Sequence, residues 1–365
     1  MTNARIKNNI LLSGGVDSAV AAFLIGAKDN DTTCYYILCW DTGNYCHSDK
    51  DYQDAVNISA SLKLPLKKLD LRDEYKSWVF EKFIQDYKNG LTPNPDVLCN
   101  SKIKFGSMIR SELKDGYIVT GHYASIFSIP DSIRNRFKHD VRNLIAIPKD
   151  LKKDQTYFLA DIFDSPIIDR IKFPLGNLLK SEVRRIAQDN SLNVYKKKDS
   201  QGICFIGDIS MRKFLSTYIE PNPGNIISRN SEVVGSHNGL FNYTVGQRKG
   251  LESIKNAGVP MYVVEKRVSD NTLVVGCRED CMAPSLELLD FKHVLRDSEV
   301  LLGLLDEEMY IRVRSSGELT GIKSLTYISE NKVKITLKQP IFAPAPGQYG
   351  VLYWNQCIIG RGVIC

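Results

Sequence analysis

The spacing of apolar and polar positions changes once along the 365-residue chain. In its first half, short apolar runs alternate with stretches of helical period, and such runs are typical of strands buried in a parallel sheet. The apolar runs lie at 9–12, 34–40, 64–71 and 116–124, and the helical stretches at 17–27, 50–62 and 74–87. This alternation predicts a doubly wound α/β domain with a parallel sheet.

A last helical pattern begins at Lys180, where Ser181 is suited to be the N-cap. After about Asn222, short β-like segments follow, separated by Gly, Pro, Asn and Asp, with turn signals at 269–271 and 355–356. Small β-barrels or sandwiches are the natural architecture for such segments. We therefore expect an α/β domain over 1–205, a small β-rich domain over 206–282 and a β-barrel domain over 283–365.

Composition narrows the class of protein only mildly. The chain has 48 Lys and Arg against 42 Asp and Glu, and this net charge of +6 permits a nucleic-acid partner without requiring one. We expect a cytoplasmic protein with no membrane span, because no signal-peptide pattern or long apolar run is evident. The nine cysteines are irregularly spaced and the five histidines are scattered, so neither a secreted disulfide framework nor a metal site is predicted.

The segment "SGGVDS" at 13–18 lies between an apolar run and a helical stretch. Gly14 and Gly15 can adopt positive φ, so consecutive backbone N–H groups can converge on an anion at the positive end of the helix. The lysine of a Walker loop and the spacing of a dinucleotide-binding loop are both missing, which disfavours those two classes. A plain tight turn between strand and helix is the alternative to a phosphate site.

Two polar segments each carry one cysteine. Cys99 lies in "NGLTPNPDVLCNSKIKFG" and Cys204 in "KKDSQGICFIGD", and we expect both segments to be surface loops, where a buried structural cysteine is unusual. Lys102 and Lys104 follow Cys99 closely, and such cations favour the thiolate. The pair is therefore a candidate for thiol chemistry, with inert packing as the alternative.

"SGGVDS" resembles the PP-loop of ATP pyrophosphatases, which bind ATP, usually with Mg²⁺, and split it between the α and β phosphates. With "TPNPDVLCNSKIKFG", "TGHYA", "KKDQTYFL" and "KKDSQGICFIG" in this order, and "YTVGQRKGL" and "APAPGQYGVLY" nearer the end, the chain resembles tRNA-specific 2-thiouridylases over nearly its whole length. The resemblance implies a PP-loop ATP-binding catalytic domain over 1–205. It also implies that ATP adenylates the carbon-2 oxygen of the wobble uridine and that sulfur then replaces this oxygen.

The same resemblance implies roles for individual residues. Cys204 would carry the incoming sulfur as a persulfide, Cys99 would attack that persulfide or close a transient disulfide, and Asp96 would act as acid and base. Asp17 is also a candidate Mg²⁺ ligand, although an aspartate at this position is often only a cap. The expected ATP-binding residues are Leu11, Leu12, Ser13, Gly14, Gly15, Val16, Asp17, Ser18, Ile37 and Gly121. The expected tRNA contacts are Asn94, Pro95, Asp96, His122, Lys153, Asp154, Gln155, Arg314, Ser315 and Gln348.

Some residues depart from the family pattern. Relatives often have an aromatic residue after the arginine equivalent to Arg314, where this chain has Ser315, and no role is assigned to Cys39, Cys46 or His47.

The implied partners are a tRNA with a wobble uridine and a persulfide-donating sulfur carrier or cysteine desulfurase, and we expect a monomer. Two alternatives stay open: an amide-forming PP-loop ligase, and a non-catalytic tRNA-binding module with a vestigial nucleotide loop.

Overall fold

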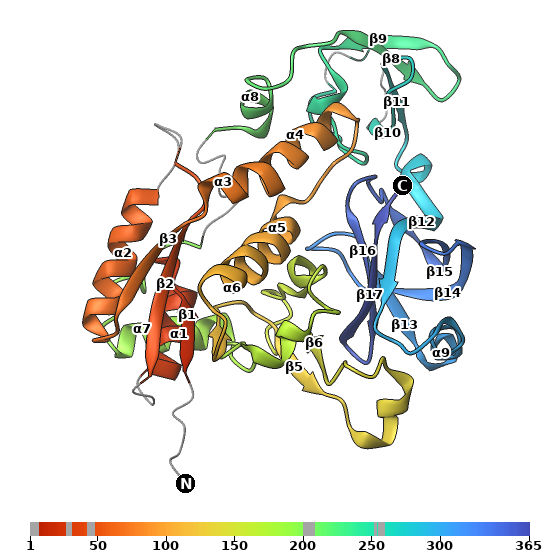
Figure 1. Cartoon of the computed structure of the whole chain (residues 1–365). Helices are drawn as coiled ribbons and strands as arrows, with labels where there is room; N and C mark the ends of the chain where they lie inside the picture. Colours follow the sequence, from red (N-terminus) through yellow and green to blue (C-terminus); the bar gives the residue numbers. More distant parts are fainter. Residues whose placement is uncertain (1–6, 27–30, 42–47, 200–208, 252–253, 255–259) are drawn as a thin grey trace.

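The computed structural model describes residues 7–26, 31–41, 48–199, 209–251, 254 and 260–365. The first part of the chain forms a five-stranded sheet in the order β3-β2-β1-β4-β7, in which every neighbouring pair is parallel. Its strands are β1 (Asn8–Leu11), β2 (Thr32–Leu38), β3 (Leu66–Asp70), β4 (Tyr117–Val119) and β7 (Ile171–Lys172). The predicted parallel sheet is therefore confirmed, and Figure 1 shows it in red and orange on the left.

Helices cover both faces of this sheet because its strands are apolar on both sides. Ile10 packs into the cluster that holds α1 (Val16–Gly26), α2 (Ser48–Ser61) and α7 (Lys180–Asp189). Its neighbour Leu11 points to the opposite cluster, as the period of two along a strand requires. That cluster holds the helical layer α3 (Arg72–Tyr75), α4 (Glu81–Lys88), α5 (Pro95–Leu98) and α6 (Met108–Ser111), with π-helical turns over Lys76–Phe80 and Cys99–Ser107.

Two local predictions are wrong. The segment around Cys99 is helical and not a surface loop, and Cys99 is only 6% exposed. The Asn and Pro of the predicted surface loop instead start a helix, because the Asn94 side chain accepts a hydrogen bond from the Asp96 N–H at 3.2 Å and Pro95 occupies the first turn.

The N-cap of α7 is the second error. The helix begins at Lys180 with Leu179 as its N-cap, so Ser181 already lies inside the first turn. The Leu179 N–H donates to the Glu182 carboxylate at 2.7 Å, and the Lys180 N–H donates to Asp150 at 2.8 Å. The carboxylates of Glu182 and Asp150 thus accept hydrogen bonds from N–H groups at the start of the helix, where a serine N-cap was predicted.

The rest of the chain is mainly β-structure. After α8 (Met211–Leu215), a small sheet forms in the order β10-β11-β8-β9 from β8 (Gly224–Ser228), β9 (Val233–His237), β10 (Tyr262–Arg267) and β11 (Thr272–Gly276). A six-stranded antiparallel barrel follows, and it closes because β12 pairs with both β15 and β17. Its elements are β12 (Met282–His293), α9 (Ser298–Gly303), β13 (Met309–Arg312), β14 (Thr320–Ser329), β15 (Lys332–Phe342), β16 (Tyr349–Trp354) and β17 (Cys357–Ile364). The predicted barrel is confirmed.

The predicted hairpin turns are also present. Asn271 lies between β10 and β11 with φ of 51°, and Asn355 and Gln356 join β16 to β17 with φ of 46° and 66°. Asparagine tolerates this left-handed conformation better than most residues.

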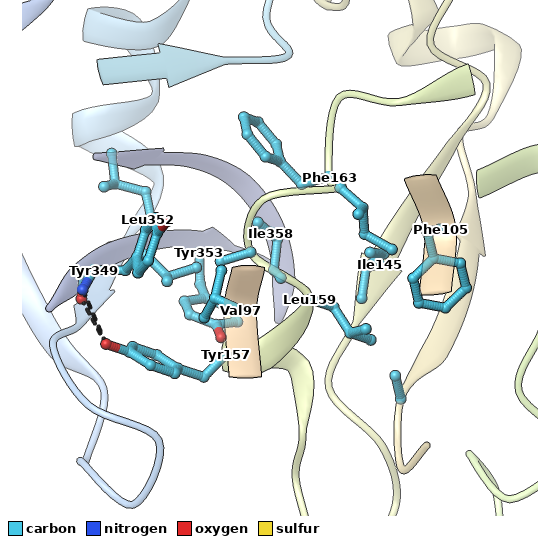
Figure 2. Close-up of a cluster of buried hydrophobic side chains, with 14 of the residues drawn as sticks. Val97, Phe105, Ile145, Tyr157, Leu159, Phe163, Tyr349, Leu352, Tyr353 and Ile358 are labelled. Atoms are coloured by element: carbon cyan, nitrogen blue, oxygen red, sulfur yellow. Dashed lines mark hydrogen bonds between the residues drawn. The ribbon is translucent and has the colours of Figure 1, made fainter. Parts of the chain in front are cut away.

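The barrel and the α/β part share one hydrophobic core. The hairpin β5 (Ser125–Ser128) and β6 (Asn143–Ala146) pairs with the barrel strand β17. Figure 2 shows Tyr157 of the α/β part beside Tyr349 and Tyr353 of the barrel. The Tyr349 N–H donates to the Tyr157 hydroxyl at 3.0 Å, and the Tyr353 hydroxyl lies 2.9 Å from that of Thr156.

Among the helices of the described ranges, none is long and apolar enough to cross a membrane.

Candidate active site

The glycine loop lies where the strand order reverses. From β1 the chain passes to β2 on one side, whereas β4 pairs with β1 on the other, and open α/β sheets bind ligands at such a switch point. Gly14 has φ of 76°, and a Cβ there would lie 2.2 Å from the Asp51 carbonyl oxygen. The Ser18 hydroxyl closes the loop, since it accepts from the Ser13 N–H at 3.2 Å and donates to the Gly15 carbonyl at 3.0 Å.

The loop after β4 packs directly on this turn. A Cβ on Gly121 would lie 2.7 Å from the Ser18 backbone nitrogen, so only glycine allows this close approach at the start of α1. Ile37 is half-buried on β2, the neighbouring strand of the sheet. The predicted ATP-binding residues from Leu11 to Ser18 are therefore joined in space by Gly121, with Ile37 one strand away. Their contact with ATP stays a prediction.

Asp17, at the start of α1, is held by a lysine and a tyrosine. The Lys180 ammonium donates to both carboxylate oxygens, at 2.7 and 2.8 Å, and the Tyr123 hydroxyl donates to one of them at 3.0 Å. A second lysine, Lys197, donates to the Gly14 carbonyl at 3.0 Å and to Asp51 at 2.7 Å. Lys180 therefore holds the glycine turn through Asp17, and Lys197 holds it through the Gly14 carbonyl.

Asp199 gathers three cations beside this turn. Its carboxylate lies 2.6 Å from the Lys153 ammonium, 2.8 Å from that of Lys180 and 2.8 Å from the Arg184 guanidinium. Partial burial alone would raise the pKa of Asp199, but hydrogen bonds from Lys153 and Lys180 outweigh it and lower the pKa to about 2. Asp199 is therefore ionised throughout the physiological pH range.

Asp96 and Cys99 lie on successive turns of one helical segment. Burial raises the pKa of the Asp96 carboxyl, and the Lys104 ammonium only partly opposes this, so Asp96 can hold a proton more readily than an exposed aspartate. The pKa of the Cys99 thiol is lowered instead. A hydrogen bond from the Cys39 side chain is the main cause, burial opposes it, and Lys104 favours the thiolate. Cys204, Cys46 and His47 lie outside the described residues.

His122, in the loop after β4, is a buried residue on which the charge of Lys104 acts. Its Nδ1 is hydrogen-bonded to the Thr120 hydroxyl, and its ring centre is 6.2 Å from that of Phe105 and 6.4 Å from that of Phe173. Burial, with a smaller effect of Lys104, lowers the pKa of His122 to about 3. The imidazole is therefore neutral at physiological pH and can hydrogen-bond a base, but it is not a counter-ion for phosphate.

Several residues predicted to contact tRNA also have partners within the chain. Asp154 is buried and forms a 2.6 Å ion pair with Arg312 of the barrel, and the Gln155 side chain accepts from the Tyr123 N–H at 2.9 Å. Gln348 donates to the Thr92 carbonyl at 2.6 Å, just before the Asn94-Pro95-Asp96 turn. The tRNA contacts of Asp154, Gln155 and Gln348 stay predictions, and so do those of the remaining candidates. Lys153 donates to Asp199, Arg314 is exposed and donates to the Phe342 carbonyl at 2.9 Å, and Ser315 is half-buried.

The structure adds three residues that sequence reasoning did not assign. Cys39 follows β2 and bonds to Cys99, and Lys180 and Asp199 link the glycine turn to Lys153. Of the two lysines predicted to favour the Cys99 thiolate, Lys104 lowers the pKa of Cys99 and also acts on Asp96 and His122, whereas Lys102 lies over the Trp78 ring at 5.9 Å. Lys180 had a sequence signal, since it opens the last predicted helix, but its partner Asp17 is 163 residues away.

The Cys39→Ala variant is expected to raise the pKa of the Cys99 thiol. It removes the hydrogen bond that favours the thiolate and leaves Lys104 in place, so the thiolate fraction at pH 7 falls. The pH dependence of Cys99 alkylation by a small reagent, quantified by mass spectrometry, measures this. Cys277→Ala, at an exposed cysteine bonded to Asp280, is the matched control. An unchanged Cys99 profile in Cys39→Ala would show that the contact does not tune the thiol.

A buried lysine joins the small sheet to the segment before Asp96. Lys266 donates to the Leu91 carbonyl and the Thr92 hydroxyl, both at 3.2 Å, and burial lowers its pKa to about 8. In the unfolded chain this pKa is near 10.4, so between pH 8 and 10 the unfolded state binds more protons. The contribution of Lys266 to the free energy of unfolding therefore rises with pH over that window.

Comparing the pH dependence of urea unfolding for the wild type and Lys266→Met isolates this contribution. We expect the difference between the two proteins to shift in favour of the wild type as the pH rises from 8 to 10. A constant difference would mean that Lys266 titrates as in the unfolded chain.

Three family models match the chain: the tRNA methyl transferase HUP domain over residues 7–208, the tRNA methyl transferase PRC-barrel domain over 212–277, and the aminomethyltransferase beta-barrel domain over 294–364. The tRNA-specific 2-thiouridylase MnmA of Buchnera aphidicola subsp. Acyrthosiphon pisum is 38% identical over 375 residues, covering 98% of this chain and 98% of the relative. The protein of the same name from Staphylococcus carnosus is 35% identical and covers 100% of this chain and 96% of its own. Because this similarity spans nearly the full length of the chain and of its relatives, the chain belongs to the family of tRNA-specific 2-thiouridylases.

Proposed function

We propose that this enzyme uses ATP to thiolate carbon 2 of the wobble uridine in tRNA. One observation carries the proposal most directly. Two adjacent residues of the loop after β4 connect the glycine turn with the thiol. Gly121 packs on the glycine turn, and the charge of Lys104 acts on the neighbouring His122 as well as on Asp96 and Cys99. An anion site and a reactive thiol within one such region are what an adenylation followed by sulfur transfer requires.

The glycine turn would perform the first half of the reaction. Backbone N–H groups of Gly14 and Gly15 and the positive end of α1 favour the phosphates of ATP. The uracil carbon-2 oxygen attacks the α-phosphorus, the bond to the β-phosphate oxygen breaks, and pyrophosphate leaves. AMP on that oxygen is a far better leaving group than the free oxygen. A divalent cation would neutralise phosphate charge here. Both oxygens of the Asp17 carboxylate contact the Lys180 ammonium, so Asp17 would hold such a cation only after that ion pair opens.

The cysteines would perform the second half. The outer sulfur of a Cys204 persulfide attacks carbon 2, and AMP departs with the oxygen. The Cys99 thiolate then attacks the Cys204 sulfur, which breaks the bond to the transferred sulfur and leaves 2-thiouridine and a Cys99–Cys204 disulfide. The transferred sulfur takes up the two electrons that the two cysteines lose in forming the disulfide, so a thiol reductant must reset the enzyme. Asp96, with its raised pKa, would handle a proton at the uracil edge.

The remaining proposed partners follow from this chemistry. A persulfide donor must load Cys204. The neutral His122 and the residues Asn94, Pro95 and Asp96 at the start of α5 would hold the uracil after it leaves its stack. Arg314, Ser315 and Gln348 would contact the tRNA from the barrel side. We also propose that the enzyme acts as a monomer.

Incubating the protein with ATP, Mg²⁺, a persulfide donor and unmodified tRNA tests the proposal. Digestion of the tRNA is expected to yield 2-thiouridine, with AMP formed only when tRNA is present. An amide-forming ligase would instead release pyrophosphate without tRNA, and a non-catalytic module would bind tRNA without forming AMP. Either result with an active donor would overturn the proposed function.

A further inference from the structure

Thr92, which lies shortly before α5, is held by both β-rich domains of the chain. Its N–H donates to the Pro346 carbonyl at 2.8 Å, and its carbonyl accepts from the Gln348 side chain at 2.6 Å. The Lys266 ammonium of β10 donates to the Thr92 hydroxyl and to the Leu91 carbonyl, both at 3.2 Å. All three polar groups of this buried threonine are therefore used, two by the barrel domain and one by the small sheet.

The same segment is packed closely by both domains. Gly90 has φ of 75°, and a Cβ there would lie 2.3 Å from the side chain of Val268, which follows β10. Gly347 has φ of 92°, and a Cβ there would lie 2.9 Å from the Thr92 backbone nitrogen. Glycine allows both the conformation and the close approach at these two positions. Residues 90–92 are therefore fixed by packing as well as by hydrogen bonds.

Two prolines make the link from Thr92 to the site stiff. The rings of Pro93 and Pro95 fix φ at about −65°, and each proline also restricts the residue before it. Asp96 lies in the first turn of α5, and Cys99 follows directly after this helix. With so few soft torsions in between, a shift of Thr92 is passed on to Asp96 and Cys99 instead of being absorbed.

The lysine at this junction carries its charge at a cost. Burial lowers the pKa of Lys266 to about 8, so at pH 7 the folded chain holds an ammonium in surroundings that disfavour its charge. An apolar side chain of similar length would avoid this cost but would offer no donor to the Leu91 carbonyl and the Thr92 hydroxyl. Strongly perturbed groups of this kind are concentrated at functional sites.

We propose that Lys266 is a positioning residue for the reaction, which holds Asp96 and Cys99 in place for the uracil by fixing the segment before α5. The inference rests on the proposed thiolation of uridine. Lys266 reaches neither reacting group itself and acts through the Leu91 carbonyl and the Thr92 hydroxyl. The glycine turn is fixed by other lysines of the α/β part, so the proposed binding of ATP should not depend on Lys266.

The Lys266→Met variant of the full-length protein tests this, because methionine keeps most of the side-chain length but has no donor. Its kcat for thiolation of tRNA is expected to fall about tenfold to a hundredfold, which is the effect of a small misplacement of reacting groups. Its KM for ATP should stay within about twofold of wild type. Arg267→Met is the matched control, since Arg267 is the next residue on β10 and pairs with Glu265 and Asp270 of its own hairpin. It should leave both constants within about twofold of wild type.

Hydrogen–deuterium exchange, measured by mass spectrometry, follows α5 without any reaction. In Lys266→Met the amides of residues 94–99 are expected to exchange about tenfold faster, whereas those of α1 exchange as in the wild type. Thr92→Val, which removes only the hydroxyl acceptor, is the milder second variant and should lower kcat by a smaller factor. Added to Lys266→Met, it should lower kcat no further, because both changes remove the same contact.

Unchanged kcat in Lys266→Met would overturn the inference, and so would an equal loss in Arg267→Met or losses that multiply in the double variant. A lower kcat together with a raised KM for ATP and faster exchange in α1 would indicate general destabilisation, which also overturns it. If the wild type forms no 2-thiouridine, the proposed function fails instead. The exchange of residues 94–99 then decides by itself whether Lys266 holds this segment.

Discussion

Replacing Cys99 by serine is expected to abolish thiolation while leaving adenylation intact. Serine keeps the size of the side chain but cannot form the thiolate that the Cys39 contact and Lys104 favour. The 2-thiouridine yield should fall by about a hundredfold or more, the scale on which single members of a catalytic unit act. Cys204→Ser is expected to give the same loss, because no persulfide can form. Release of pyrophosphate with tRNA and ATP, which marks adenylation, should continue in both variants.

Mass spectrometry of digested tRNA measures the thiolation, and radiolabelled ATP measures the pyrophosphate released by adenylation. Cys277→Ser is the control, since Cys277 is exposed and its side chain contacts only its near neighbours Glu279 and Asp280 among the described residues. Full thiolation by Cys99→Ser would exclude Cys99 from sulfur transfer. Loss of the folded state would indicate that its buried thiol serves packing alone.

Arg312→Leu is expected to lower the free energy of unfolding by about 3 to 5 kcal/mol. Arg312 and Asp154 form a 2.6 Å ion pair in which the side chains are only 9% and 4% exposed, and the pair joins the barrel to the α/β part. Without the guanidinium, the Asp154 carboxylate stays buried with only the hydrogen bonds from Thr156 to stabilise it. Breaking such a pair costs more than replacing both partners.

Urea unfolding of a double-mutant cycle measures this coupling. Adding Asp154→Asn to Arg312→Leu should recover part of the loss, because the uncompensated charge is removed. Arg314→Leu, at an exposed arginine two positions along the chain, should change the stability by less than about 1 kcal/mol. Equal losses for Arg312→Leu and Arg314→Leu would show that the burial of the Asp154–Arg312 pair has no energetic consequence.

Local signals accounted for most of the architecture. Alternating apolar runs and helical periods predicted the parallel sheet and its helices, and the Asn271 and Asn355 turns were read from residues that tolerate positive φ. The glycine turn was also a local signal, because Gly14 needs a conformation that its neighbours cannot adopt without strain. The errors arose where one local pattern has two meanings: Asn94 and Pro95 fit a turn and a helix start equally well, and only the apolar residues that follow decide between them.

By itself, the sequence determined the fold class, the glycine turn and the cysteines proposed to react, because each depends on residue types at short spacing. The tertiary structure alone decided which charged groups meet. Lys180 reaches Asp17 across 163 positions, Arg312 reaches Asp154 across 158, and the contact of Cys39 with Cys99 depends on how β2 and the α5 segment pack. The strength of such interactions depends on distance and burial in the folded chain, and neither quantity has a signature in the spacing of residues along it.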